Sequence, residues 1–397
     1  MEEVMIIGSG RSGRGMIGEM YDSIGGYHLN FADIDTSLVN GLQKQKYYKV
    51  IIKNLINGNE KERIIKNFDI YDIYNDREEY INKLAESKFV HTALFPEAFD
   101  QAIIDLVDSI KLKKEKLIKS LTIVVLGANY IGLEEYFKPR IINKLNSEEK
   151  EFFENNYVVV GSNANRKVIY STNVSEYELT ADDKNILKVN NSPCFDKDFK
   201  YPNFFEIVDN IEIVMIEKIW SQNLEHIILA LMGAFKGYSI INESIEDEYI
   251  KKVAYNAWLE ARLAMKKKYD IPIPDKLTKI NEYKKFDSQY FEDTLKRIGR
   301  DLKRKLKRND RLIGPALLCL ETGIIPYFIT KGIAYGFYYN DDTDDTKEIN
   351  CYTNKYGILK SVEKYCELDK NNKNENIILQ LIVASYNDIK DEVVEFY

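Results

Sequence analysis

A lysine, an asparagine and a histidine lie in one strongly apolar stretch of the sequence, and together they could move a proton. Lys218, Asn223 and His226 stand between Asp209 and Phe235, where most of the other residues are apolar. Burial penalises polar side chains unless they are paired or used. At about 100° per residue in an α-helix, Asn223 and His226 would lie roughly 140° and 80° around from Lys218. One broad face of a predicted helix therefore carries all three.

This set of side chains suits the oxidation of a secondary alcohol. The reaction removes the hydroxyl proton while hydride leaves carbon, and a lysine whose pKa burial has lowered toward neutrality can accept that proton. Asn223 would donate a hydrogen bond to the developing oxyanion, and His226 would orient the substrate oxygen or the lysine. The alternative is that Lys218 extends to solvent and that the other two are satisfied core residues.

A second cluster, at the start of the chain, is typical of dinucleotide binding. The apolar run from Val4 to Ile7 ends in a glycine-rich turn, after which apolar residues recur at helical spacing. Gly8 permits a tight turn, Gly10 lets the backbone approach a pyrophosphate, and Gly13 lets helix and strand pack closely. The helix N-terminus would present its free N–H groups to the phosphates. The predicted cofactor contacts here are Gly8, Gly10, Arg11, Ser12 and Gly13.

A second strand, predicted from Tyr27 to Ala32, ends at an aspartate, Asp33. A carboxylate in this position can accept hydrogen bonds from the adenosine ribose hydroxyls and would repel a 2′-phosphate. The pattern therefore predicts NAD, rather than NADP, as the cofactor. The alternative is a glycine-rich turn followed by an incidental aspartate.

Strands and helices alternate through the first half of the chain. Further strands are predicted at Tyr48 to Lys53, Lys88 to Leu94 and Leu121 to Leu126, with a helix at Ala98 to Ile110. This alternation predicts the α/β class, with a Rossmann-like, doubly wound parallel sheet. Thr92, Ala93 and Asn129 follow strand ends and would border the cofactor crevice.

The second half of the chain is predicted to be mostly α-helical. A length of 397 residues is enough for two domains. A polar, irregular stretch from Asp183 to Pro202 marks the expected boundary, which we place after residue 195. Residues 1–195 would form the NAD-binding domain, and residues 196–397 would form a helical catalytic domain. A helix from Asp247 to Met265 carries an apolar stripe typical of a helical bundle.

Composition argues against several classes of protein and site. No apolar stretch approaches the roughly 18 residues that cross a bilayer, so we expect no membrane partner. The N-terminus opens into a predicted strand rather than a signal segment, which favours a cytoplasmic protein. The net charge of −7 argues against a nucleic-acid partner. Four cysteines without metal-like spacing and three histidines argue against a metal site. Monomer and dimer both stay open.

The spacing Lys218-x4-Asn223-x2-His226 resembles the signature of the polyol-specific long-chain dehydrogenases, the mannitol dehydrogenase family. Similar segments are spread over almost the whole chain: Gly8 to Gly18, Phe31-Ala32-Asp33, Arg297-x-Gly299-Arg300, Arg304-Lys305-Leu306, Asp310-Arg311-Leu312 and Leu320-Glu321-x-Gly323. The resemblance implies catalysis by a lysine acid–base without a metal, with Asn223 and Asn129 polarising the carbonyl. The chain length is most like the mannitol-1-phosphate 5-dehydrogenase branch, which implies a sugar-phosphate substrate.

The chain departs from the family pattern where substrate and cofactor would be bound. Ala128 stands where the family usually has an acidic residue before the asparagine, and Asn165 replaces the aspartate of a Val-Asp-Arg motif. The segment from His91 to Phe95 replaces Thr-Thr-Ala-Val-Gly. These changes leave open a second hypothesis, a biosynthetic reductase of the same family that acts on a different ketone or hydroxy acid.

Basic residues are crowded between Lys296 and Arg311. Guanidinium groups bind phosphate oxygens bidentately, so those that match the family pattern are candidates for substrate binding. The candidates are Arg300, Arg304 and Lys305, with Asn165 as a further one. The alternative is a solvated helix face whose arginines pair with acidic residues.

The leading hypothesis is an NAD-dependent oxidoreductase that interconverts a secondary alcohol and a ketone on a polyol or sugar phosphate, of the mannitol 1-phosphate/fructose 6-phosphate type. Its catalytic residues would be Lys218, Asn223, His226 and Asn129. A third hypothesis is a non-catalytic NAD-binding regulatory protein. Such a protein would be free to lose buried polar residues, so their presence speaks against it.

Overall fold

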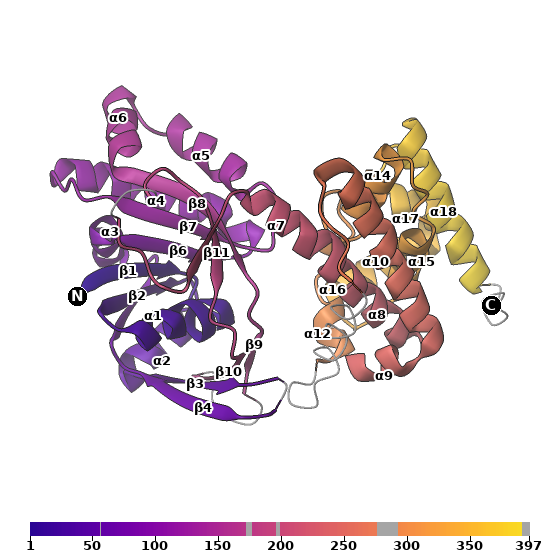
Figure 1. The fold of residues 1–397 in the computed structure, drawn as a ribbon, viewed down its shortest axis with the longest axis horizontal. Coiled ribbons are helices and arrows are strands. Elements are labelled where there is room, and N and C mark those ends of the chain that lie inside the picture. The colour runs from indigo at the N-terminus through magenta and orange to yellow at the C-terminus, as the bar shows by residue number, and fades with distance from the viewer. Residues whose placement is uncertain (56, 172–176, 196–198, 276–292, 391–397) are drawn as a thin grey trace. The chain divides into compact units, whose positions relative to one another are not determined.

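The computed structural model describes residues 1–55, 57–171, 177–195, 199–275 and 293–390 (Figure 1). The chain divides into two compact units, Met1–Met215 and Ile216–Tyr397. This division lies later than the one expected after residue 195, because strand β12 (Phe205–Val208) pairs with β11 (Leu187–Asn190) and so belongs to the sheet of the first unit. The expected boundary adjoins residues 196–198, which lie outside the described residues.

The first unit is built on an eight-stranded sheet with the order β12-β11-β8-β7-β6-β1-β2-β5. Its other strands are β1 (Glu2–Ile7), β2 (Tyr27–Asp33), β5 (Phe68–Asp72), β6 (Phe89–Ala93), β7 (Thr122–Gly127) and β8 (Tyr157–Ala164). Strands β8 to β5 in this order run parallel, and β11 pairs antiparallel with β8. The chain reverses its direction of progress between β1 and β6, and ligands of such sheets bind outside the carboxyl ends of the strands at this point.

Helices cover both faces of this sheet, as the doubly wound prediction requires (Figure 1). They are η1 (Gly13–Gly18), α1 (Glu19–Ile24), α2 (Thr36–Gln45), α3 (Arg77–Glu86), η2 (Pro96–Ala98), α4 (Phe99–Glu115), α5 (Leu133–Asn143) and α6 (Ser147–Asn156). Because side chains alternate along a strand, Val4 and Ile6 pack in one core with η1, α1 and α2. Met5 and Ile7 pack in the other core with α3 to α6. The predicted Rossmann-like α/β fold is confirmed.

The strand predicted at Tyr48 to Lys53 exists, but it does not belong to the parallel sheet. It is β3 (Tyr48–Lys53) of a second sheet with the order β4-β3-β10-β9. The other strands are β4 (Glu60–Ile65), β9 (Val168–Tyr170) and β10 (Glu178–Asp182). Tyr48 and Val50 are buried in the same core as Met16 and Ile17 of η1, so this sheet covers the glycine-rich helix. The short strand β5 takes the place beside β2.

The second unit is mostly helical over its described residues, which confirms the predicted mostly helical C-terminal part. Its helices begin with the end of α7 (Ile211–Glu217) and continue with η3 (Lys218–Gln222), α8 (Asn223–Phe235), α9 (Ile241–Glu246), α10 (Glu248–Tyr269), α12 (Leu295–Gly299), α13 (Leu302–Lys305), α14 (Ile313–Glu321), α15 (Tyr327–Gly336), α16 (Asp344–Tyr356), α17 (Ile358–Tyr365) and α18 (Lys373–Lys390). Helix α8 packs against α9, α10, α12 and α15 and is buried on nearly every side, as its composition predicts. No helix of the described part is long and apolar enough to span a bilayer.

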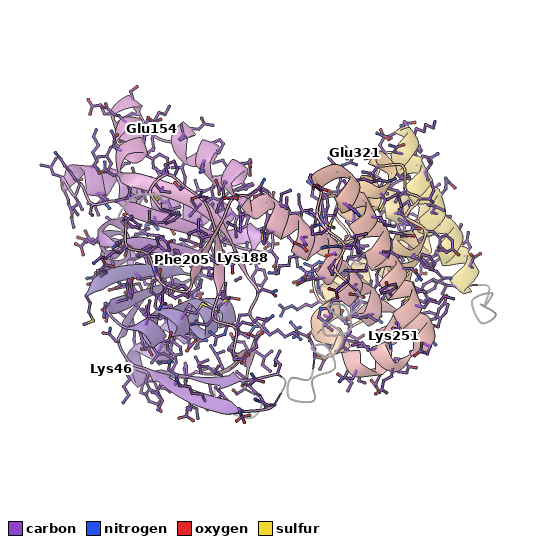
Figure 2. The ribbon with its side chains drawn as sticks, viewed as in Figure 1. Lys46, Glu154, Lys188, Phe205, Lys251 and Glu321 are labelled. Atoms are coloured by element: carbon purple, nitrogen blue, oxygen red, sulfur yellow. The ribbon has the colours of Figure 1, made fainter. Side chains whose placement is uncertain are left out.

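His91 of β6 is enclosed by aromatic side chains in the first unit. It is 1% exposed, and its Nε2 atom lies 2.8 Å from the Tyr21 hydroxyl. The ring of Phe205, labelled in Figure 2, lies 6.0 Å from the imidazole, centroid to centroid. A charged imidazole would lose its hydration here, so burial lowers the pKa of His91 to about 3.

We expect His91 to make the protein sensitive to acid. In the unfolded chain the pKa of this histidine returns to about 6.5, so at lower pH the unfolded state binds a proton that the folded state excludes. The stability that the neutral His91 contributes is fully present above about pH 6.5 and is lost as the pH falls toward 3. Between about pH 7 and about pH 4.5, this residue should lower the free energy of unfolding by roughly 2 to 3 kcal/mol.

Urea denaturation at several pH values checks this expectation. The variant His91→Gln keeps an acceptor for the Tyr21 hydroxyl but cannot take up the proton, so its stability should fall less between the two pH values. Parallel pH dependence of wild type and variant would show that His91 is not the group responsible.

Candidate functional site

The turn between β1 and η1 depends on backbone contacts that glycine allows. Gly8 has a φ of +99°, and a Cβ atom there would lie 2.5 Å from the carbonyl oxygen of Ala93. A Cβ atom on Gly13 would lie 1.9 Å from the carbonyl oxygen of Gly8. On Gly10, by contrast, it would meet nothing within 4 Å. Gly8 and Gly13 therefore let strand and helix meet, while the backbone of Gly10 is left open to a ligand.

Asp33 lies beside this turn and is bound to it. The Ser9 N–H donates to Asp33 Oδ2 at 2.6 Å, and the Asp35 N–H donates to Asp33 Oδ1 at 3.1 Å. Asp72 stands in register with Asp33 on the neighbouring strand. The Thr36 hydroxyl and nearby N–H groups lower the pKa of Asp72 to about 2. Two carboxylates thus lie side by side at this edge of the sheet.

Thr92 and Ala93 end β6, which lies next to β1 in the sheet, and Asn129 follows the end of β7, the next strand beyond β6. Thr92 is 1% exposed, and its hydroxyl accepts a hydrogen bond from the Gly127 N–H at 3.0 Å. It therefore fixes the strand end that leads to Asn129, which is exposed. The main-chain carbonyl of Ala93 lies against Gly8. The carboxyl edge of the sheet therefore holds the predicted residues of the glycine turn together with Asp33, Thr92, Ala93 and Asn129.

A π-helical turn carries Lys218, the predicted acid–base. Residues Lys218–Gln222 form this turn, and the Asn223 N–H donates to the Lys218 carbonyl five residues earlier. The offset of roughly 140° expected from α-helical spacing therefore does not apply, because an i→i+5 bond sets residues five apart nearly above one another. Lys218, Asn223 and His226 are all half-buried, while most of the other residues of α8 are buried. π-turns inside helices occur frequently at functional sites.

His226 lies near a carboxylate that sequence reasoning missed. Its Nε2 atom is 3.6 Å from Oδ2 of Asp293, a side chain that is 1% exposed. Arg297 binds the same carboxylate through Nε and Nη2. The sequence offers one local signal, the spacing of four residues between Asp293 and Arg297; the approach to His226 is long-range.

The predicted phosphate-binding residues have partners inside the second unit. Lys305 is 5% exposed, and its ammonium donates to the Ile298 carbonyl at 2.7 Å and to the Arg300 carbonyl. Burial, followed by the charges of Arg311 and Arg304, lowers the pKa of Lys305 to about 7. Arg304 donates to Asp310 at 2.8 Å. Arg300 is the most exposed of the three candidates.

Asn165 is exposed on the turn between β8 and β9 in the first unit. The next residue anchors this turn, since Arg166 donates to the Asp182 carbonyl at 2.7 Å and to Glu19 at 2.5 Å. The side chain of Asn165 is thus presented from a fixed backbone. Among the described residues, no group of three or more His, Cys, Asp or Glu side chains is arranged to hold a metal ion.

Both units match models of one protein family. The Rossmann-domain model of mannitol dehydrogenase matches residues 2–187, and the model of its C-terminal domain matches residues 210–395. The chain belongs to the mannitol dehydrogenase family. This confirms the resemblance found in the sequence, and it makes the chain an oxidoreductase of the polyol dehydrogenase type.

Individual proteins also resemble the chain over nearly its whole length. The chain is 29% identical to mannitol-1-phosphate 5-dehydrogenase of Thermoanaerobacter pseudethanolicus, over 98% of this chain and 99% of that protein. Its fold matches that of Pseudomonas fluorescens mannitol 2-dehydrogenase, solved with NAD and D-mannitol, with a TM-score of 0.79 at 12% identity, over 98% of this chain and 92% of that one. A D-sorbitol dehydrogenase structure matches with a TM-score of 0.73 at 13% identity, over 98% of this chain and 93% of that one.

We expect the two glycines of the turn to respond differently to alanine. Gly13→Ala would press a methyl group onto the Gly8 carbonyl and should lower the free energy of unfolding by about 1 to 3 kcal/mol. Gly10→Ala has open space and should stay within roughly 0.5 kcal/mol of wild type. Chemical denaturation of the two variants measures the difference. Equal stability of both would mean that the close approach at Gly13 is not a constraint on this fold.

Proposed function

We propose that the protein is an NAD-dependent oxidoreductase that interconverts a secondary alcohol and a ketone on a polyol or sugar phosphate, of the mannitol 1-phosphate/fructose 6-phosphate type. The observation that carries the proposal is the π-turn that sets Lys218 and Asn223 above one another, beside His226, on a buried helix. Relatives named as mannitol-1-phosphate 5-dehydrogenases, of nearly the same length, support the substrate class. A cytoplasmic location, independence of metal and the monomeric or dimeric state stay predictions.

The residues at the glycine turn fit a dinucleotide. The open backbone at Gly10 gives a pyrophosphate room to approach, and the first turn of the following helix offers N–H groups to it. Asp33 would accept hydrogen bonds from the adenosine ribose hydroxyls. When bound, NAD supplies the acceptor for the hydride that leaves the alcohol carbon.

Lys218 would take the hydroxyl proton in oxidation and return it in reduction. Asn223 and Asn129 would donate hydrogen bonds to the oxygen as negative charge develops on it. His226, beside the Asp293 carboxylate, would orient the substrate oxygen or the lysine. In this assignment the protein's own side chains transfer the hydroxyl proton and donate the hydrogen bonds to the substrate oxygen.

Recognition of the substrate phosphate is proposed for Arg300, Arg304, Lys305 and Asn165. Lys305 has three N–H donors, and two of them are directed at carbonyl oxygens, which leaves one for a ligand. Arg304 is also paired with Asp310. Because such partners occupy groups that would bind a phosphate, they also favour the second candidate, a reductase of the same family whose substrate is a different ketone or hydroxy acid.

We expect NADH to bind more tightly than NADPH, and Asp33→Asn to reduce that preference. Removing the charge lowers the repulsion of the 2′-phosphate, while the amide oxygen can still accept from the Ser9 N–H. The ratio of the two dissociation constants should change by about tenfold. Fluorescence titration with NADH and NADPH measures it. Asp69→Asn, near the amino end of β5, is the control. If wild type, Asp33→Asn and Asp69→Asn all show the same preference for NADH, Asp33 does not select the cofactor.

We expect Lys218→Ala to lose turnover by at least about a hundredfold. The assay supplies NAD with a panel of polyols and polyol phosphates and follows the formation of NADH. Lys331→Ala, another half-buried lysine of the second unit, is the control and should keep its activity. Turnover that survives Lys218→Ala would refute the assignment of this residue as the base. If wild type turns over no member of the panel but reduces a different ketone or oxidises a hydroxy acid, the second candidate is favoured.

A further inference from the structure

We propose that Arg14 is a positioning residue for the dinucleotide pyrophosphate. It holds the peptide between Ser9 and Gly10 with the Gly10 N–H directed outward, and it places a positive charge beneath the turn. This inference rests on the proposed binding of NAD and extends it to a residue outside the glycine pattern.

Arg14 binds two successive residues of the turn, Ser9 and Gly10, from the buried side. Its side chain is fully buried, with an exposed fraction of 0%. Its Nε–H donates to the Ser9 carbonyl at 2.6 Å, and its backbone N–H donates to the Gly10 carbonyl at 3.1 Å. Arg14 is thus bound to the turn through both its side chain and its main chain.

The direction of the Gly10 N–H follows from the Ser9 carbonyl. The peptide is trans, so its C=O and N–H groups point in opposite directions. Because Arg14 draws the Ser9 carbonyl inward, the Gly10 N–H must point away from the guanidinium. The preceding N–H, that of Ser9, is already donated to Asp33. The Gly10 N–H is therefore the donor that Arg14 prepares for a phosphate oxygen.

The second sheet holds Arg14 in this position. The guanidinium carbon lies 5.8 Å from the ring centroid of Tyr48, and the Tyr48 hydroxyl donates to the Arg14 carbonyl at 3.2 Å. Tyr48 itself is 0% exposed and comes from β3. A guanidinium stays charged at any pH of interest, and its field on a nearby anion is stronger in a buried, weakly polarisable site than in water. The dipole of the helix and the charge of Arg14 therefore both favour a negatively charged ligand at the turn.

The test compares NADH with AMP, which keeps adenine, ribose and one phosphate but lacks the pyrophosphate. Arg14→Met removes both the charge and the donor, and it should raise the dissociation constant of NADH by at least about tenfold and that of AMP by less than about threefold. Arg14→Lys keeps the charge without the planar fork and should lie between Arg14→Met and wild type. Arg63→Met is the matched control, because Arg63 pairs with Glu19 and Asp22 beside the same helix.

Fluorescence titration gives the dissociation constant of NADH, displacement of NADH gives that of AMP, and thermal melting reports stability. Unchanged binding of NADH by Arg14→Met, or weakening of both ligands in the same proportion, would overturn the role of Arg14. If Arg14→Met does not fold, Arg14→Lys decides: binding of NADH as tight as that of Arg63→Met overturns the inference. If wild type itself binds no NADH, the proposed function is what fails.

Discussion

The close approach of η1 to β1 is the constraint on which the first unit depends. With no side chain at Gly13, the helix can begin against the carbonyl of Gly8, and its direction away from the strand is then fixed. The helix lies between two sheets, because Tyr48 and Leu179 of the smaller sheet share the core of Val4 and Ile6. The polar turn is thereby supported by an apolar core that also encloses the side chain of Arg14.

In the second unit, the residues proposed for the chemistry lie at the π-turn η3. An i→i+5 bond widens the helix, and such turns persist only where surrounding packing holds them. Here the packing comes from α8, which continues the same helix and is buried among α9, α10, α12 and α15. Lys218, Asn223 and His226 are half-buried, in contrast to the fully buried stretch from Ile227 to Gly233 that follows them. A rigid helix can hold such side chains more accurately than a loop can.

Much of this arrangement was predictable from the sequence, and the remainder has identifiable physical reasons. Glycine spacing and strand ends predicted the turn, Asp33 and the parallel sheet, because these features are local in the chain. The placement of β3 in a second sheet was not predictable, since apolar alternation identifies a buried face but not the strand beside it. The π-turn depends on a backbone bond that periodicity does not report. The approach of Asp293 to His226 joins segments far apart in sequence.

Lys305 of the second unit shows why a lowered pKa does not by itself identify a base. Burial and two nearby arginines lower the pKa of Lys305 to about 7, yet its ammonium donates to the carbonyls of Ile298 and Arg300 and ties α12 to α13. Loss of its proton would weaken those hydrogen bonds, so proton exchange there opposes the fold. Lys218 stands at the start of the π-turn, with the proposed oxyanion donor Asn223 directly after that turn. An acid–base needs a reacting oxygen and its hydrogen-bond donors within reach as well as a suitable pKa, and the neighbours of Lys218, more than its burial, are what favour it for that role.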